Sequence, residues 1–238
     1  MIKKIISIIC LMPSFVWAGE QTTETRNGFY LRADVGASKM KNAKQHNVYP
    51  EYNINVEDNK SKSKVSPRVE IATGFYLNDY IRHDLSFIYQ KVKFKKSTVD
   101  CVWLDHEEDI LDEKGNFTVN RKATIYSLMF NSYFDLPINE NFNFFAGVGV
   151  GIARINEKGK LILTANKINV SSDKIKSKKK QNFAHSLTTG ISYKLNQNTN
   201  LELSYKWSDY GKTRYNDKDV TKNRYRGHSI LTGIRYSI

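Results

Sequence analysis

Residues 142–155 read FNFFAGVGVGIARI, and this stretch alternates at every second position, as a β-strand with two different faces does. One face carries Phe144, Ala146, Val148, Val150 and Ile152. The opposite face carries Phe145, Gly147, Gly149, Gly151 and Ala153. Because small inward residues leave room for bulky neighbours in a narrow barrel, the segment predicts a barrel strand with its apolar face toward lipid.

Seven further segments show the same alternation, so the sequence predicts eight strands. They are 28–37, 67–77, 81–94, 122–136, 182–195 and the stretches around 201–207 and 230–238. The strand 81–94 is the least regular, because Ile88 falls on its polar face. Strands of about 9 to 14 residues have the length needed to cross an outer membrane at the usual tilt.

The connections between these segments alternate in length. Three are short turns, at 78–80, 137–141 and 196–199, and four are long and polar, at 38–65, 95–121, 156–181 and 209–226. A soluble β-sandwich is the alternative, but it has no need of such regular alternation. The prediction is therefore an all-β fold, an eight-stranded antiparallel transmembrane β-barrel with four long external loops.

The N-terminal segment indicates export. Lys3 and Lys4 precede an apolar run over 5–17, which ends in the small-residue cleavage pattern Val16-Trp17-Ala18. The run is shorter than the roughly 20 residues of a transmembrane helix. We therefore expect a signal peptide at 1–18 and an outer-membrane β-barrel domain at 19–238, in which Cys101 is the single cysteine and no internal disulfide forms.

Five segments carry a family resemblance: GFYLRADVGA at 28–37, FFAGVGVGIA at 144–153, NFAHSLTTGISYKL at 182–195, NLELSYKWSDYG at 200–211 and GHSILTGIRYSI at 227–238. The chain resembles the surface-antigen and opacity-type outer-membrane barrels, which include small adhesins of intracellular α-proteobacteria. The resemblance implies a protein of the cell outer membrane with extracellular loops and both termini in the periplasm. The chain departs from the family at its end, where Ile238 stands in place of the usual aromatic residue.

Strand alternation also points nine charged residues into the barrel. They are Arg32, Asp34, Arg68, Glu70, Arg82, Asp84, Glu202, Lys206 and Arg235. Because charges removed from water must pair, we expect a mutually neutralising network that fills the lumen. A selective pore is the alternative, but an eight-stranded barrel is only wide enough for its own side chains.

The loop 156–181 holds a cluster of cations, Lys174, Lys176, Lys178, Lys179 and Lys180. The formal net charge of the chain is +13. Because the protein is exported, we expect lipopolysaccharide, sulfated host glycans or host surface proteins as partners, and no nucleic acid. The competing interpretation is a solvated face that contacts lipopolysaccharide. The acidic loop 95–121 lacks the spacing of a calcium loop, so no metal or cofactor is expected.

A hydrolase site is not apparent. The pairs His185-Ser186 and His228-Ser229 place base and nucleophile on opposite faces of a strand, where they cannot converge. We therefore expect no catalytic residues. The function predicted is that of a monomeric surface adhesin or surface antigen, and the alternative is a structural barrel that interacts with lipopolysaccharide.

Overall fold

The computed structural model describes residues 28–41, 63–95, 97–102, 114–165, 168–176, 181–214 and 222–238. In 97–102, 114–117, 119, 161, 163–165, 168–176, 214 and 222–223 it describes the backbone but not the side chains. The expected signal peptide at 1–18 lies outside the described residues, as do the middle parts of the expected loops. Among the described residues, no helix is long and apolar enough to cross a membrane.

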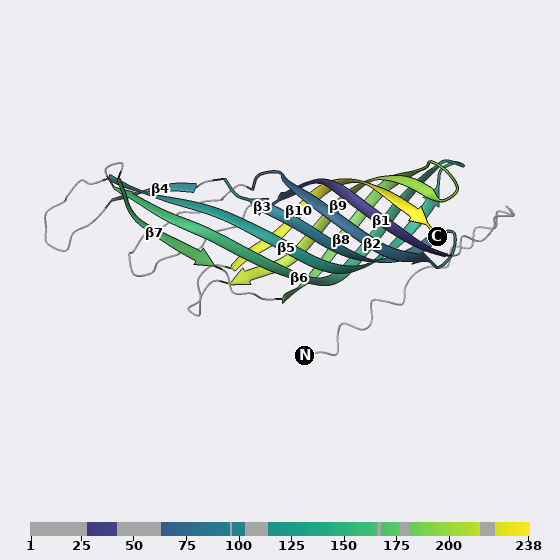
Figure 1. Cartoon of the computed structure of the whole chain (residues 1–238), viewed down its shortest axis with the longest axis horizontal. Helices are drawn as coiled ribbons and strands as arrows, with labels where there is room; N and C mark the ends of the chain where they lie inside the picture. Colours follow the sequence, from purple (N-terminus) through teal and green to yellow (C-terminus); the bar gives the residue numbers. More distant parts are fainter. Residues whose placement is uncertain are drawn as a thin grey trace.

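All regular elements in the described ranges are strands (Figure 1). They are β1 Gly28–Met40, β2 Ser66–Tyr76, β3 Ile81–Lys93, β4 Ser97–Val102, β5 Lys114–Pro137, β6 Phe142–Ala165, β7 Ile168–Lys176, β8 Gln181–Lys194, β9 Thr199–Arg214 and β10 Lys222–Ser237. Every pairing is antiparallel. Eight strands follow one another around a ring in the order β1-β2-β3-β5-β6-β8-β9-β10, and β10 pairs with β1 to close it. The predicted eight-stranded barrel is confirmed.

One end of the barrel carries three short turns that share a single geometry. In each turn an asparagine side chain accepts hydrogen bonds from two backbone N–H groups further along, at 2.8 to 3.0 Å. The asparagines are Asn78, Asn139 and Asn196. An asparagine that bonds its own backbone in this way fixes a tight turn. We call this the turn end, and the opposite end of the barrel the far end.

The register between β5 and β6 is set by size complementarity inside the lumen. Tyr133 lies opposite Gly147, Asn131 opposite Gly149 and Met129 opposite Gly151. A Cβ added at any of these glycines would collide with the facing strand or its side chain. Because each large inward residue needs a glycine across from it, a shift of the pairing by two residues would not fit.

Three predicted loops are largely strand. In the loop predicted at 209–226, β9 continues to Arg214 and β10 begins at Lys222. β5 begins at Lys114, eight residues before the predicted start at 122, and β6 continues to Ala165 rather than ending at 155. β4 adds to the outer edge of β5, and β7 adds to the outer edge of β6. The predicted loops 95–121, 156–181 and 209–226 were therefore wrong over these stretches. The period-2 pattern is lost there because both faces of the strands are polar or mixed.

Beyond the barrel, β5 and β6 pair only with each other and with the two added strands. The last partner of β5 on β3 is Lys93, opposite Lys122, and the last partner of β6 on β8 is Gln181, opposite Arg154. Figure 1 shows β4 and β7 at the far end, well away from the C-terminus. We call the four strands β4-β5-β6-β7 in this region the projecting sheet.

Large apolar side chains cover the outer wall of the barrel. They include Leu31, Ile71, Phe87, Phe130, Val150, Leu187, Leu203 and Ile234, which are 43–56 % exposed. An apolar wall of this size in contact with water would be strongly unfavourable, and lipid is the solvent that fits it. The predicted outward faces of the strands are the exposed ones.

Candidate functional site

All nine charged residues predicted to line the lumen do lie there, and each is at most 5 % exposed. The barrel brings them together with a tenth, Asp135 on β5, which the sequence analysis did not include. Asp135 accepts two hydrogen bonds from Nε of Arg82, at 3.0 and 3.1 Å. Within the described lumen the network therefore holds five cations and five carboxylates, so its charge is balanced.

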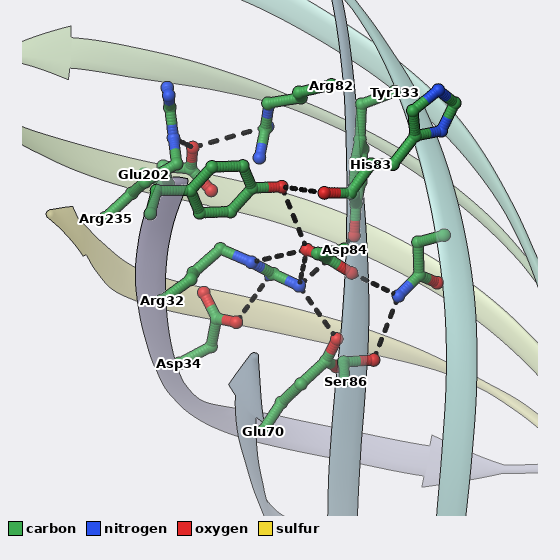
Figure 2. Close-up of polar contacts among 12 residues, drawn as sticks. Arg32, Asp34, Glu70, Arg82, His83, Asp84, Ser86, Tyr133, Glu202 and Arg235 are labelled. Carbon is green, nitrogen blue, oxygen red and sulfur yellow. Dashed lines mark hydrogen bonds and ion pairs between the residues drawn. The ribbon is translucent and has the colours of Figure 1, made fainter. Parts of the chain in front are cut away.

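The centre of the network is Arg32 on β1 (Figure 2). Its guanidinium lies 2.6 Å from Asp34, 2.9 Å from Asp84 and 3.1 Å from Glu70. Asp84 also accepts a hydrogen bond from the amide of Asn131 at 2.6 Å. Three carboxylates from three strands thus hold one arginine, and a buried charge is tolerated when it is surrounded in this way.

Glu70 links this centre to the middle of the barrel. Its two carboxylate oxygens accept hydrogen bonds from Arg32, from Arg68 at 2.8 Å and from the ammonium of Lys206 at 2.7 Å. Arg68 continues across the lumen, where it donates to the hydroxyls of Ser208 and Ser229, each at 3.2 Å. One carboxylate therefore ties together β1, β2 and β9.

A second cluster lies nearer the turn end (Figure 2). Glu202 is 2.6 Å from Arg235 and 3.3 Å from Arg82. The Arg82 guanidinium also lies over the ring of Tyr133, 4.3 Å from its centre, and 5.0 Å from the centre of the Phe145 ring. Arginine binds both carboxylates and aromatic faces, so Arg82 links the carboxylates of this cluster to the aromatic rings of Tyr133 and Phe145.

Toward the far end, beyond the charged residues, the side chains that fill the lumen become apolar. The far half of the interior is filled by an apolar cluster of Met40, Ile88, Val92, Phe94, Ala123, Ile125, Met129, Ala153, Ile155, Ala184, Tyr210 and Tyr225. This cluster explains why Ile88 falls on the polar face of its strand, since it points into the interior and is fully buried. The sequence analysis missed the cluster because it described the interior mainly by its charged and small residues.

The rim of the far end carries two further ion pairs. Arg121 lies 3.7 Å from Glu157, and Arg224 lies 2.6 Å from Asp209. From the turn end to the far end, the lumen therefore contains the charged network, then the apolar cluster and then these two ion pairs. In the described part of the chain, no group of three or more His, Cys, Asp or Glu side chains could hold a metal ion.

The predicted lysine cluster lies only partly in the described residues. Lys174 and Lys176 are on the backbone of β7, and Lys178, Lys179 and Lys180 are outside the described ranges. The register places Lys174 opposite Lys160 and Lys176 opposite Lys158. Directly paired residues share one face of a sheet, so the cluster continues onto β6, a grouping that the sequence alone did not reveal.

In the two described His-Ser pairs, the histidine and the serine lie on opposite sides of the barrel wall. His185 and His228 are on the outer wall, where the His185 ring is tilted against Trp207 and the His228 ring stacks on Tyr205. The neighbouring Ser186 and Ser229 are buried in the lumen. Base and hydroxyl therefore point to opposite sides of the strand, as the alternation requires.

Comparison with known proteins gives one family. The profile described as "Outer membrane protein beta-barrel domain" matches residues 8–237. A protein of Rickettsia akari named "Putative adhesin" is 31% identical over 222 residues, covering 89% of this chain and 88% of its own. One of Rickettsia conorii with the same kind of name is 28% identical over 236 residues, covering 91% of this chain and 85% of its own.

A solved structure shares the fold. The crystal structure of Neisserial surface protein A superposes with a TM-score of 0.52 at 15% sequence identity, covering 89% of this chain and 97% of the other. At that identity the similarity establishes the architecture alone.

Proposed function

Because the chain belongs to the outer-membrane β-barrel domain family, we propose that it is a surface adhesin whose far end contacts host-cell components. The protein resides in the outer membrane, and its apolar wall lies in lipid. On this proposal the turn end and both termini face the periplasm, and the far end faces outward. The names of its relatives in Rickettsia support the same function.

The projecting sheet is the observation that carries the proposal. β5 and β6 stay paired from Pro137 opposite Asn143 at the turn end to Gly115 opposite Ala165 beyond the barrel. A barrel that only spans the membrane needs about 9 to 11 residues per strand, and each of these two has 24. The surplus length builds a sheet outside the membrane, and its two outer strands present backbone edges to other molecules.

The interior supports a function at the surface. A charge-balanced network and an apolar cluster fill the lumen, so we propose that the barrel does not conduct and serves as a rigid anchor. We also propose that it is not an enzyme, since its described histidines are on the lipid-facing wall.

The contact region that we propose is the basic part of the projecting sheet. It comprises Lys174 and Lys176 on β7 with Lys160 and Lys158, which lie opposite them on β6. To these we add Lys178, Lys179 and Lys180, which follow β7 in the sequence and lie outside the described residues. Sulfated glycans or acidic host proteins are the partners whose charge fits. We expect the protein to act as a monomer.

The proposal is tested by displaying the protein on a non-adherent bacterium and counting the cells that attach to a host monolayer. One variant lacks residues 97–119 and 160–180, each replaced by an Asn-Gly turn, so that the barrel and its Arg121–Glu157 pair remain. The control lacks 215–221, the connection between β9 and β10. Attachment should fall to background in the first variant and persist in the control. Equal attachment by the wild type and by the variant without its projecting sheet would refute the proposal.

A further inference from the structure

Five lysine positions, on or next to five neighbouring strands, form one continuous row across the sheet. The backbone N–H of Lys64, just before β2, donates to the carbonyl of Lys93 on β3 at 2.8 Å. Lys93 lies directly opposite Lys122 on β5, and Lys122 lies directly opposite Lys158 on β6. The backbone register continues the row to Lys176 on β7. We call these positions the lysine row.

The first four lysines of the row are exposed. None of the ion pairs formed by the described side chains includes any of them. The described acidic side chains do not neutralise these lysines. Those near the far end, Glu157 and Asp209, point inward and are buried. Two others, the half-buried Asp79 and the exposed Glu140, are in turns at the opposite end of the barrel. The row is therefore a line of positive charge with no described carboxylate beside it.

Such a row weakens the sheet that carries it. Like charges directly opposite one another in neighbouring strands repel, and the ladder here repeats this unfavourable pair at each step. A bound polyanion would attract each lysine and so offset the repulsion between neighbouring lysines. The arrangement is thus one that a negatively charged ligand would stabilise.

The row also climbs away from the membrane. Lys64 is adjacent in sequence to Val65, an exposed apolar residue of the outer wall. Lys93 lies four residues beyond Tyr89 on its strand, and Lys158 lies six residues beyond Ile152. Because the strands are tilted, a row perpendicular to them rises from the lipid boundary toward the projecting sheet.

We propose that the lysine row binds a linear sulfated polysaccharide, which lies across the strands. Neighbouring strands are about 4.8 Å apart, so the five positions span roughly 19 Å at regular intervals. A sugar ring is about as long as one such interval, so a chain that bears an anionic group on nearly every ring matches the row charge for charge. A lipid headgroup would place its phosphates at one height above the bilayer, which only the lower end of the row could reach.

The ligand class rests on the proposed attachment function, but its test does not. The purified protein is placed in discs of zwitterionic lipid that contain no lipopolysaccharide, and heparin oligosaccharides of defined length are titrated into it. Affinity should rise with length until the oligosaccharide spans the row, at about four sugar rings, and should fall as salt rises because exposed charges are screened.

The opposite wall of the barrel supplies a matched control. The variant Lys93→Gln/Lys122→Gln removes two adjacent charges of the row from β3 and β5. The variant Lys212→Gln/Arg226→Gln removes two exposed charges from β9 and β10, which lie across the ring. Two exposed ion pairs should account for roughly a 5- to 10-fold loss of affinity in the first variant, with a weaker salt dependence, and the second should be unchanged.

The readouts separate the possible outcomes. The row variant should be at least as stable to heat as the wild type, since it loses a repulsion, so weaker binding cannot be attributed to misfolding. Equal losses in both variants would reduce the effect to net charge and overturn the inference. Unchanged heparin binding with a loss of binding to lipopolysaccharide vesicles would overturn it in favour of a lipid contact. Cell attachment that persists without heparin binding would refute this inference and leave the adhesin function standing.

Discussion

Replacing Glu70 with alanine should cost the barrel a large part of its stability. Glu70 is fully buried and holds three cations, Arg32, Arg68 and Lys206, at 3.1, 2.8 and 2.7 Å. After the substitution Arg32 keeps Asp34 and Asp84. Lys206 has no other carboxylate partner among the ion pairs of the described residues, so it becomes a buried and unpaired ammonium.

The expected loss follows from that geometry. Breaking a buried pair by removing one partner destabilises a protein by about 3–5 kcal/mol, and here a single deletion leaves two cations without a carboxylate. We therefore expect a value near the upper end of that range. The control is Glu140→Ala, at an exposed carboxylate in a turn, where the change should stay within about 0.5 kcal/mol.

The measurement is a urea titration of the protein folded into detergent micelles, followed by tryptophan fluorescence and by heat-modifiable migration. The double variant Glu70→Leu/Lys206→Met removes both charges and should be less destabilised than the sum of its single variants. No stable conductance should appear in any of them, because the apolar cluster above the network remains. A loss below about 1 kcal/mol in Glu70→Ala would refute the view that the network is a set of mutually required pairs.

Three further outcomes are expected. Ile88→Ala should cost about 2–5 kcal/mol by opening a cavity in the fully buried cluster, whereas Ile152→Ala on the lipid-facing wall should cost less, as measured by the same titration. Changing Lys176, Lys178, Lys179 and Lys180 to serine should lower attachment to host cells in a counting assay. Heat-modifiable migration should stay unchanged, because none of the four takes part in the buried ion pairs of the described lumen. The refolded protein should show a β-type circular dichroism spectrum, and a helical one would contradict the fold.

The strand pattern predicted the barrel because the two faces of each strand meet very different surroundings. Lipid on one side and a crowded lumen on the other impose a period of two, and that period is visible from Phe144 to Ile152. The three turns were predictable because each contains an asparagine that closes the turn with its own side chain. Outside the lipid layer the constraint disappears, and the strands of the projecting sheet could not be recognised.

The partners inside the lumen could be predicted only as a set. Alternation points Arg82 and Asp135 inward, but the distance between them depends on how β3 and β5 align. The apolar cluster was missed for a related reason. Alternation tells which side a residue faces, but it does not tell how polar the interior is at each height along the barrel.

The lysine row also could not be predicted from the sequence. Its members are far apart in the chain and are brought together only by the alignment of the strands. Its register is set from within the lumen, where Met129 and Tyr133 need Gly151 and Gly147 across from them. The lumen does not, however, require lysine on the outer face at 93, 122 or 158. A serine or glutamate at any of these positions would relieve the repulsion and leave every inward contact in place. The fold therefore explains why these positions are adjacent but not why all of them are lysine, and a polyanionic ligand supplies a reason.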